Sequence, residues 1–154
     1  VFAHMVAAGN DYVIPSGATL RTMADNTANT FLGDSLKLAG TIAFKKTADM
    51  ADKVKVLTFP KLIADGGTLN NEYENVNAFE LAGNLEIPEG KTLTVLNQGD
   101  ATTSKARNFK ISSTTTGSGT LYVSLGGSST SGTSSMLELS GDWSEFGPDC
   151  RRVG

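Results

Sequence analysis

The chain has 154 residues and a formal net charge of −3, and its 32 serine and threonine residues outnumber its 29 charged residues. This composition excludes a coiled coil or helical bundle, because those proteins are rich in alanine, glutamate, lysine and leucine at heptad spacing. The acidic balance gives no indication of a nucleic-acid or anionic membrane surface, and no apolar run approaches the roughly 20 residues of a membrane span.

Three parts are expected along the chain. Residues 1–9 are interpreted as a cloning remnant and lead-in segment, because Val1 to Met5 do not resemble a native start. Residues 10–146 carry the regular pattern and are predicted to form one domain, and residues 147–154 are predicted to form an irregular tail.

A short unit recurs from the start of this domain: a glycine, then threonine with an apolar residue, then alternating apolar and polar residues. Its threonines are Thr19, Thr41, Thr68, Thr92 and Thr120, so the steps are 22, 27, 24 and 28 residues. A repeat of this length matches one coil of a parallel β-solenoid with three short strands and three turns.

A second set of alternating segments lies between these units. In chain order the segments are 11–14, 35–38, 61–63, 79–81, 85–87, 109–111 and 136–139. Glycine, proline, asparagine and aspartate separate nearly all of them, and no segment shows sustained helical periodicity. The sequence therefore predicts an all-β protein.

Two all-β architectures fit this pattern. The favoured one is a short right-handed parallel β-helix (solenoid) of about five to six coils, because similar residues return at one-coil intervals and can stack. The alternative is an antiparallel β-sandwich, which also has short, evenly spaced strands. In the solenoid we expect one core ladder of Leu20, Ile42, Leu69, Leu93 and Leu121, and further core positions at Leu36, Leu38, Leu81, Ile87, Ile111, Leu137 and Leu139.

Several of these segments also resemble a known repeat. Residues 10–22, 31–38, 62–71 and 81–87, followed by 117–123 and 137–146, are similar to the autotransporter-associated β-strand repeat. The resemblance implies a right-handed parallel β-helix in an exported bacterial passenger or adhesin-like protein, where such regions are mainly rigid stalks. In that family another glycine–threonine strand follows the element that contains Trp143 and Phe146, whereas here the chain continues into Gly147 and Pro148.

Few residues offer catalytic chemistry. The only histidine is His4 and the only cysteine is Cys150, so a serine or cysteine triad, a histidine-containing zinc site and an intrachain disulfide are all excluded. We therefore expect no catalytic residues, no metal and no cofactor.

A polysaccharide-binding or polysaccharide-degrading module is the alternative function. Glu72 and Glu74 flank Tyr73, and in a strand they would share one face about 7 Å apart. Lys105, Arg107 and Lys110 form a basic cluster farther along the chain. Tyr73, Lys105 and Arg107 are thus the candidate binding residues, although a solvated turn explains them as well.

The C-terminal part is rich in serine and threonine, which is typical of a glycosylated, sugar-binding or ice-binding surface, or of a polar loop. For residues 126–135 we favour the polar loop. Trp143 and Phe146 are expected to cover the last coil, which predicts end-to-end or edge-to-edge self-association of poorly covered ends.

Together these features predict a structural or adhesive module of a secreted or cell-surface bacterial protein. The expected partners are surface glycans or other proteins, with no nucleic acid.

Overall fold

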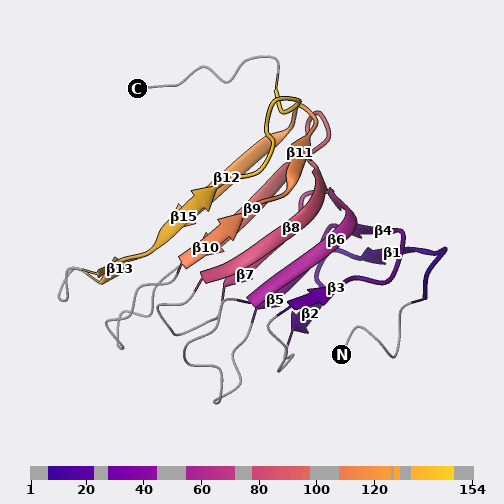
Figure 1. Cartoon of the computed structure of the whole chain (residues 1–154), viewed down its shortest axis with the longest axis horizontal. Helices are drawn as coiled ribbons and strands as arrows, with labels where there is room; N and C mark the ends of the chain where they lie inside the picture. Colours follow the sequence, from indigo (N-terminus) through magenta and orange to yellow (C-terminus); the bar gives the residue numbers. More distant parts are fainter. Residues whose placement is uncertain are drawn as a thin grey trace.

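The computed structural model describes residues 7–22, 28–44, 55–71, 78–97, 108–125, 127–128 and 133–147. All regular structure in these segments is β, and the strands lie on three faces that the chain visits in the order A, B, C (Figure 1). None of the described segments forms a helix that could span a bilayer.

The strands of each face follow one another at one-coil intervals. Face A holds β1 (Asp11–Ile14), β4 (Ser35–Leu38), the second half of β6 (Lys55–Ala64), the second half of β8 (Ala78–Glu86) and β11 (Thr114–Thr116). Face B holds β2 (Thr19–Thr22), β5 (Thr41–Phe44), β7 (Thr68–Asn71), β9 (Thr92–Asn97) and β12 (Thr120–Leu125). Face C holds β3 (Ala28–Thr30), the first halves of β6 and β8, β10 (Asn108–Ile111) and β15 (Met136–Leu139).

Neighbouring strands on all three faces pair in parallel, which confirms the β-solenoid and shows that the antiparallel sandwich is wrong. Each face is five strands deep, at the lower end of the expected number of coils. Segment 142–147 continues face A beyond β11, because Gly147 N donates to Gly117 O at 2.8 Å. The right-handed sense of the winding stays a prediction.

The core ladder of face B differs from the predicted one at its C-terminal end. Leu69 pairs with Val95 instead of Leu93, and Val95 pairs with Val123 instead of Leu121. The shift is two residues, so every inward side chain remains inward. Leu93 is nevertheless fully buried and pairs with Leu121.

The interior of the solenoid is apolar along its length. On face C, Phe79 pairs with Phe109, and both rings contact Phe44 of face B, with centroid separations of 3.8 Å for Phe44–Phe79 and 5.5 Å for Phe44–Phe109. These three side chains are almost completely buried. Large aromatic side chains therefore fill the corner between faces B and C.

An asparagine pair lies in the interior next to this aromatic cluster. Asn71 Nδ2 donates to Asn97 Oδ1 at 2.8 Å, and Asn97 Nδ2 donates to Met136 O at 3.0 Å. Both asparagines are fully buried. The side-chain amides of these two residues thus bond each other across neighbouring coils, whereas the exposed Asn84 donates to Pro60 O.

Replacing Asn97 with alanine is expected to lower the free energy of unfolding by about 2 kcal/mol or more, because Asn71 Nδ2 and Met136 O each lose a buried partner. The matched change Asn84→Ala removes one exposed hydrogen bond and is expected to cost less than about 1 kcal/mol. Urea unfolding of both variants measures the difference. Equal losses would show that the buried amide pair does not stabilise the corner.

The two ends of the solenoid are covered differently. At the first coil, Tyr12 packs edge-on against Phe31, and Ala7 N donates to the Tyr12 hydroxyl at 2.9 Å. At the last coil, Trp143 packs edge-on against Phe146 at 5.4 Å, and both lie partly buried against the core.

A short hairpin projects from the last coil. Strands β13 (Gly127–Ser128) and β14 (Thr133–Ser134) pair antiparallel within the region that the sequence predicted as a loop. The prediction of a loop without strands over 126–135 was therefore wrong at these positions, where serine, threonine and glycine alone form the strands.

Candidate functional site

The predicted binding residues lie outside the described residues. Tyr73, with Glu72 and Glu74, belongs to the connection between β7 and β8, and Lys105 and Arg107 belong to the connection between β9 and β10. Each connection leads from face B to face C. The candidate site among the described residues is therefore sought on the faces themselves.

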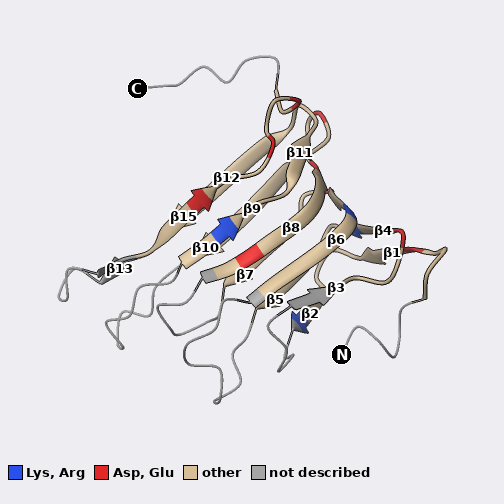
Figure 2. Ribbon diagram, in the orientation of Figure 1, with Lys and Arg blue, Asp and Glu red and all other residues tan. Residues whose placement is uncertain are grey.

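The clearest polar arrangement is a row of charges on the outer surface of face C. In the register of face C, Glu80 lies beside Lys110 and Lys110 lies beside Glu138, so opposite charges alternate over three successive levels. Figure 2 shows the row as red, blue and red bands on β8, β10 and β15. We call these three residues the charged row.

The sequence places each member of the charged row between two apolar neighbours. Glu80 follows Phe79, Lys110 follows Phe109, and Glu138 follows Leu137. Alternation in a strand buries the apolar neighbours and turns the charged residue outward. The shared apolar–charged–apolar pattern was the signal that could have identified this row from the sequence.

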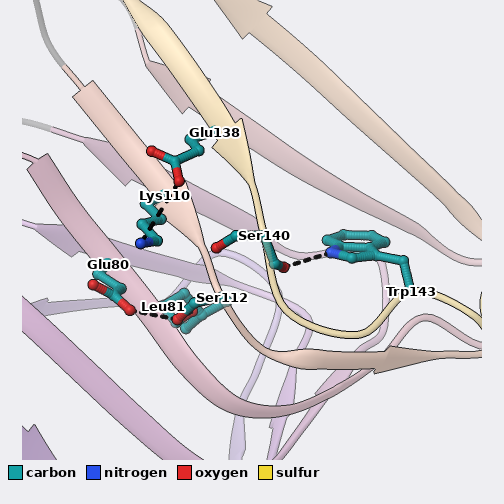
Figure 3. A network of polar contacts seen from close by, with 7 residues as sticks. All are labelled: Glu80, Leu81, Lys110, Ser112, Glu138, Ser140 and Trp143. Atoms are coloured by element: carbon teal, nitrogen blue, oxygen red, sulfur yellow. Dashed lines mark hydrogen bonds and ion pairs between the residues drawn. The ribbon is translucent and has the colours of Figure 1, made fainter.

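Close contacts hold the charged row in place. Lys110 Nζ lies 3.6 Å from Glu138 Oε1, and Ser112 Oγ donates to Glu80 Oε1 at 2.5 Å (Figure 3). The side chains of Lys110 and Glu138 are 32% and 52% exposed. Solvent and ligands can therefore reach the row.

The only tryptophan of the chain follows β15, past the charged row. Trp143 Nε1 donates to Ser140 O at 2.8 Å, just after β15, and the indole lies next to Ser140 in Figure 3. Ser140 Oγ is buried without a hydrogen-bond partner. Face C thus combines carboxylates, an ammonium group and hydroxyls at one end of the solenoid.

The distance between the two carboxylates limits the chemistry that the charged row could perform. Glu80 and Glu138 lie two levels apart, which corresponds to about 9.6 Å between their strands. Inverting glycosidases place their two carboxyl groups about 6.5–9.5 Å apart. Here, however, one carboxylate accepts a hydrogen bond from Ser112 and the other pairs with Lys110, so the arrangement fits a neutralised surface that offers hydrogen bonds.

A second charged cluster lies at the corner between faces A and B. Asp65 Oδ2 is 3.2 Å from Lys37 Nζ, and Asp65 Oδ1 is 2.5 Å from Lys91 Nζ. Hydrogen bonds from Lys91 and then Lys37 lower the pKa of the Asp65 carboxyl below its usual value. The cluster joins three successive coils, because each residue belongs to a different one.

The lowered pKa of Asp65 predicts a pH-dependent contribution to stability. Its folded-state pKa lies below the unfolded value of about 3.9, so the contribution is fully present above that value and is lost as the pH falls through the folded pKa. Asp65→Asn is therefore expected to lower the melting temperature at pH 7 and to match the unsubstituted protein in strong acid.

Melting curves between pH 7 and pH 2 measure this effect. As a control, Asp65→Asn in a Lys37→Met, Lys91→Met background is expected to have a smaller effect at pH 7, because both partners are gone. A constant difference at every pH would contradict the proposed ion pairs.

On face B, threonines align on the outer surface. Thr19, Thr41, Thr68 and Thr94 pair in register, and Tyr122 occupies the fifth level. The predicted alignment instead placed Thr92 beside Thr68, so the observed register replaces it. The line of outward positions two residues earlier in each strand contains only two neighbouring threonines, Thr92 and Thr120. Two residues are too few for an ice-binding array.

Among the described residues, no group of three or more histidine, cysteine, aspartate or glutamate side chains could hold a metal ion. The charged row and the Asp65 cluster both mix cations with carboxylates. Because positive and negative charges pair within each of them, both clusters fit a structural role on the surface better than a metal site.

Comparisons with protein-family models, curated proteins and solved structures found no match to this chain. The likeness to the autotransporter-associated repeat accordingly stays a hypothesis. The functional argument rests on the geometry of the solenoid and its surfaces.

Proposed function

We propose that this chain is a structural or adhesive solenoid module of a secreted or cell-surface bacterial protein, without catalysis of its own. One observation carries the proposal: an apolar core runs through all five levels, and its buried polar side chains include two pairs that bond each other. Asn71 bonds Asn97 at 2.8 Å, and Ser113 bonds Thr115 at 3.1 Å. Such an interior supports a rigid rod.

The described surface also supports a scaffold. Lys61 pairs with Glu86, Lys110 with Glu138, and Asp65 with two lysines, so oppositely charged residues on neighbouring coils bind one another. These ladders link the coils along the axis of the solenoid. Exposed ion pairs contribute little individually, and several together help to fix the register between coils.

Enzymatic assays on the purified chain test the absence of catalysis. We expect no new reducing ends and no unsaturated products from polyuronic acids or neutral polysaccharides. Turnover that Glu80→Gln or Glu138→Gln abolishes, while the melting temperature is retained, would overturn the proposal.

Carbohydrate binding at face C is the second candidate function, and the charged row is the observation that favours it. Carboxylates and an ammonium group on one accessible face can exchange hydrogen bonds with sugar hydroxyls. A glycan array tests this candidate. Binding that Lys110→Met removes and Lys37→Met leaves unchanged would place the ligand on face C, whereas an empty array would exclude the candidate for the glycans present.

A further inference from the structure

The last coil of the solenoid exposes four large apolar side chains. Tyr122, Leu125, Met136 and Leu139 are 57%, 50%, 52% and 49% exposed. On the first coil, Ile14 and Phe31 are 7% and 3% exposed, whereas Val13 and Leu32 are 60% and 47% exposed. Leu125 and Leu139 lie at inward positions of the last coil, and Tyr122 and Met136 lie on its outer surface beside them. We call the edge of the solenoid that carries these four residues the open end.

The open end also presents strand edges. β12 and β15 are the last strands of their sheets, and no other described strand pairs with their outer edges. β12 contains no charged residue and β15 contains one, Glu138, whereas the edge strands of the first coil include Asp11 in β1 and Arg21 in β2. Unpaired edges with apolar side chains are templates for pairing with another chain.

We propose that the open end binds the open end of a second copy of this chain, around a two-fold axis that lies midway between β15 and the β15 of the copy. The proposal deepens the scaffold function by naming a partner of the module. It follows from the order of the strands in the last coil.

The last coil consists of β12 on face B, β15 on face C and segment 142–147 on face A, in that order. One full coil rises about 4.8 Å, so each of the three is about 1.6 Å higher than the one before. An axis half a strand spacing beyond β15, the middle strand, exchanges faces A and B. It places segment 142–147 of each copy one strand spacing above β12 of the other, and the gap closes evenly on all three faces.

Stacking the open end on the first coil of another copy does not close in this way. The described part of the chain begins on face A with β1 and also ends on face A, where segment 142–147 lies beside β11 through backbone hydrogen bonds and one isolated bridge. Placing β1 of one copy on segment 142–147 of another leaves one level unfilled on faces B and C. The geometry therefore favours the two-fold arrangement, which buries apolar side chains from both partners.

Charge selects the register of the central pair. If β15 pairs antiparallel with its copy so that the two Leu137 residues lie opposite each other, Glu138 of one copy lies opposite Met136 of the other. If instead the two Glu138 residues lie opposite each other, their carboxylates repel, which is unfavourable. Asp142 and Glu145 lie nearby on segment 142–147. Association is therefore expected to strengthen with added salt, because salt screens repulsion between the acidic rims.

Sedimentation velocity over a range of concentrations tests the proposal. The unsubstituted protein is expected to form dimers, and Leu139→Lys is expected to weaken them at least about tenfold, because each copy would bring a charge into the apolar contact. Val13→Lys is the matched control, since Val13 is a 60% exposed apolar residue on the first coil. Melting curves check that both variants fold.

Thiol cross-linking in a Cys150→Ser background locates the contact. Met136→Cys is expected to give dimers with a short bismaleimide, whereas Val13→Cys alone is not. A strict monomer at the highest soluble concentration would overturn the proposal, as would mixed cross-linking of the two cysteine variants, which indicates head-to-tail stacking. Neither result would alter the absence of turnover that tests the scaffold function.

Discussion

Leu93→Asp is expected to unfold the solenoid or to lower its free energy of unfolding by about 4 kcal/mol or more. Leu93 is fully buried and pairs with Leu121 on face B. The substitution removes a packed apolar side chain, which typically costs about 2–5 kcal/mol, and it adds a carboxyl group that has no partner in the core. Circular dichroism during thermal and urea unfolding measures the loss.

The neighbouring change Thr94→Asp is the matched control. Thr94 points to the outer surface of the same strand and is partly exposed, so the same new charge remains in contact with water. Its effect is expected to stay below about 1 kcal/mol. Similar losses for the two variants would contradict the inward and outward assignment of β9.

Gly83→Ala is expected to cost about 3 kcal/mol or more. Gly83 lies in β8 where the strand bends from face C to face A, and its φ of 94° is a conformation that favours glycine. A Cβ at this position would overlap the backbone carbonyl oxygen of Phe59 on the neighbouring coil. The change therefore adds backbone strain to a steric clash that no side-chain rotation relieves.

Gly66→Ala measures the backbone strain without the steric clash. Gly66 has a similar φ of 85°, but a Cβ there would meet no atom within 4 Å. Its expected cost is only the strain of about 1–2 kcal/mol. Urea unfolding of the two variants measures the difference, and equal costs would show that the coils at Gly83 are not in close backbone contact.

Much of the fold could be predicted from the sequence, because strand alternation and turn residues are local signals. Residues 11–14, 35–38 and 136–139 form strands with the predicted bounds. The threonine-led units also form strands, all on face B. A return of similar residues every 22 to 28 positions requires parallel stacking, and this argument separated the solenoid from the sandwich.

The alignment between coils could not be predicted in full. A shift of two residues keeps inward side chains inward, so Leu93 and Val95 are equally suitable partners for Leu69 by pattern alone. At the corner before face B the backbone is held in the observed alignment, because Thr94 N donates to Gly67 O at 3.0 Å. That contact joins different coils and has no local sequence signal.

The charged row was missed for a similar reason. Glu80, Lys110 and Glu138 are 30 and 28 residues apart, and only the register of face C brings them into one line. The long strands β6 and β8 hide this register in the sequence, because each bends around a corner and contributes to two faces. Of the basic cluster expected from the sequence, only Lys110 lies in the charged row, and the candidate residues Tyr73, Lys105 and Arg107 fall in the connections between faces.

The register of face B is the central claim, since it fixes the core ladder, the threonine alignment and the stacking of the coils. A double variant with Thr68→Cys and Thr94→Cys, in a Cys150→Ser background, tests it by disulfide formation under mild oxidation. Paired residues on adjacent strands have Cα atoms about 4.8 Å apart, within the range of a disulfide, whereas a pair offset by two residues is about 8 Å apart and cannot be bridged. We predict a disulfide between positions 68 and 94 and none in the Thr68→Cys, Thr92→Cys variant. A disulfide only in the second variant would contradict the register, and a disulfide in neither would contradict the parallel stacking of β7 on β9.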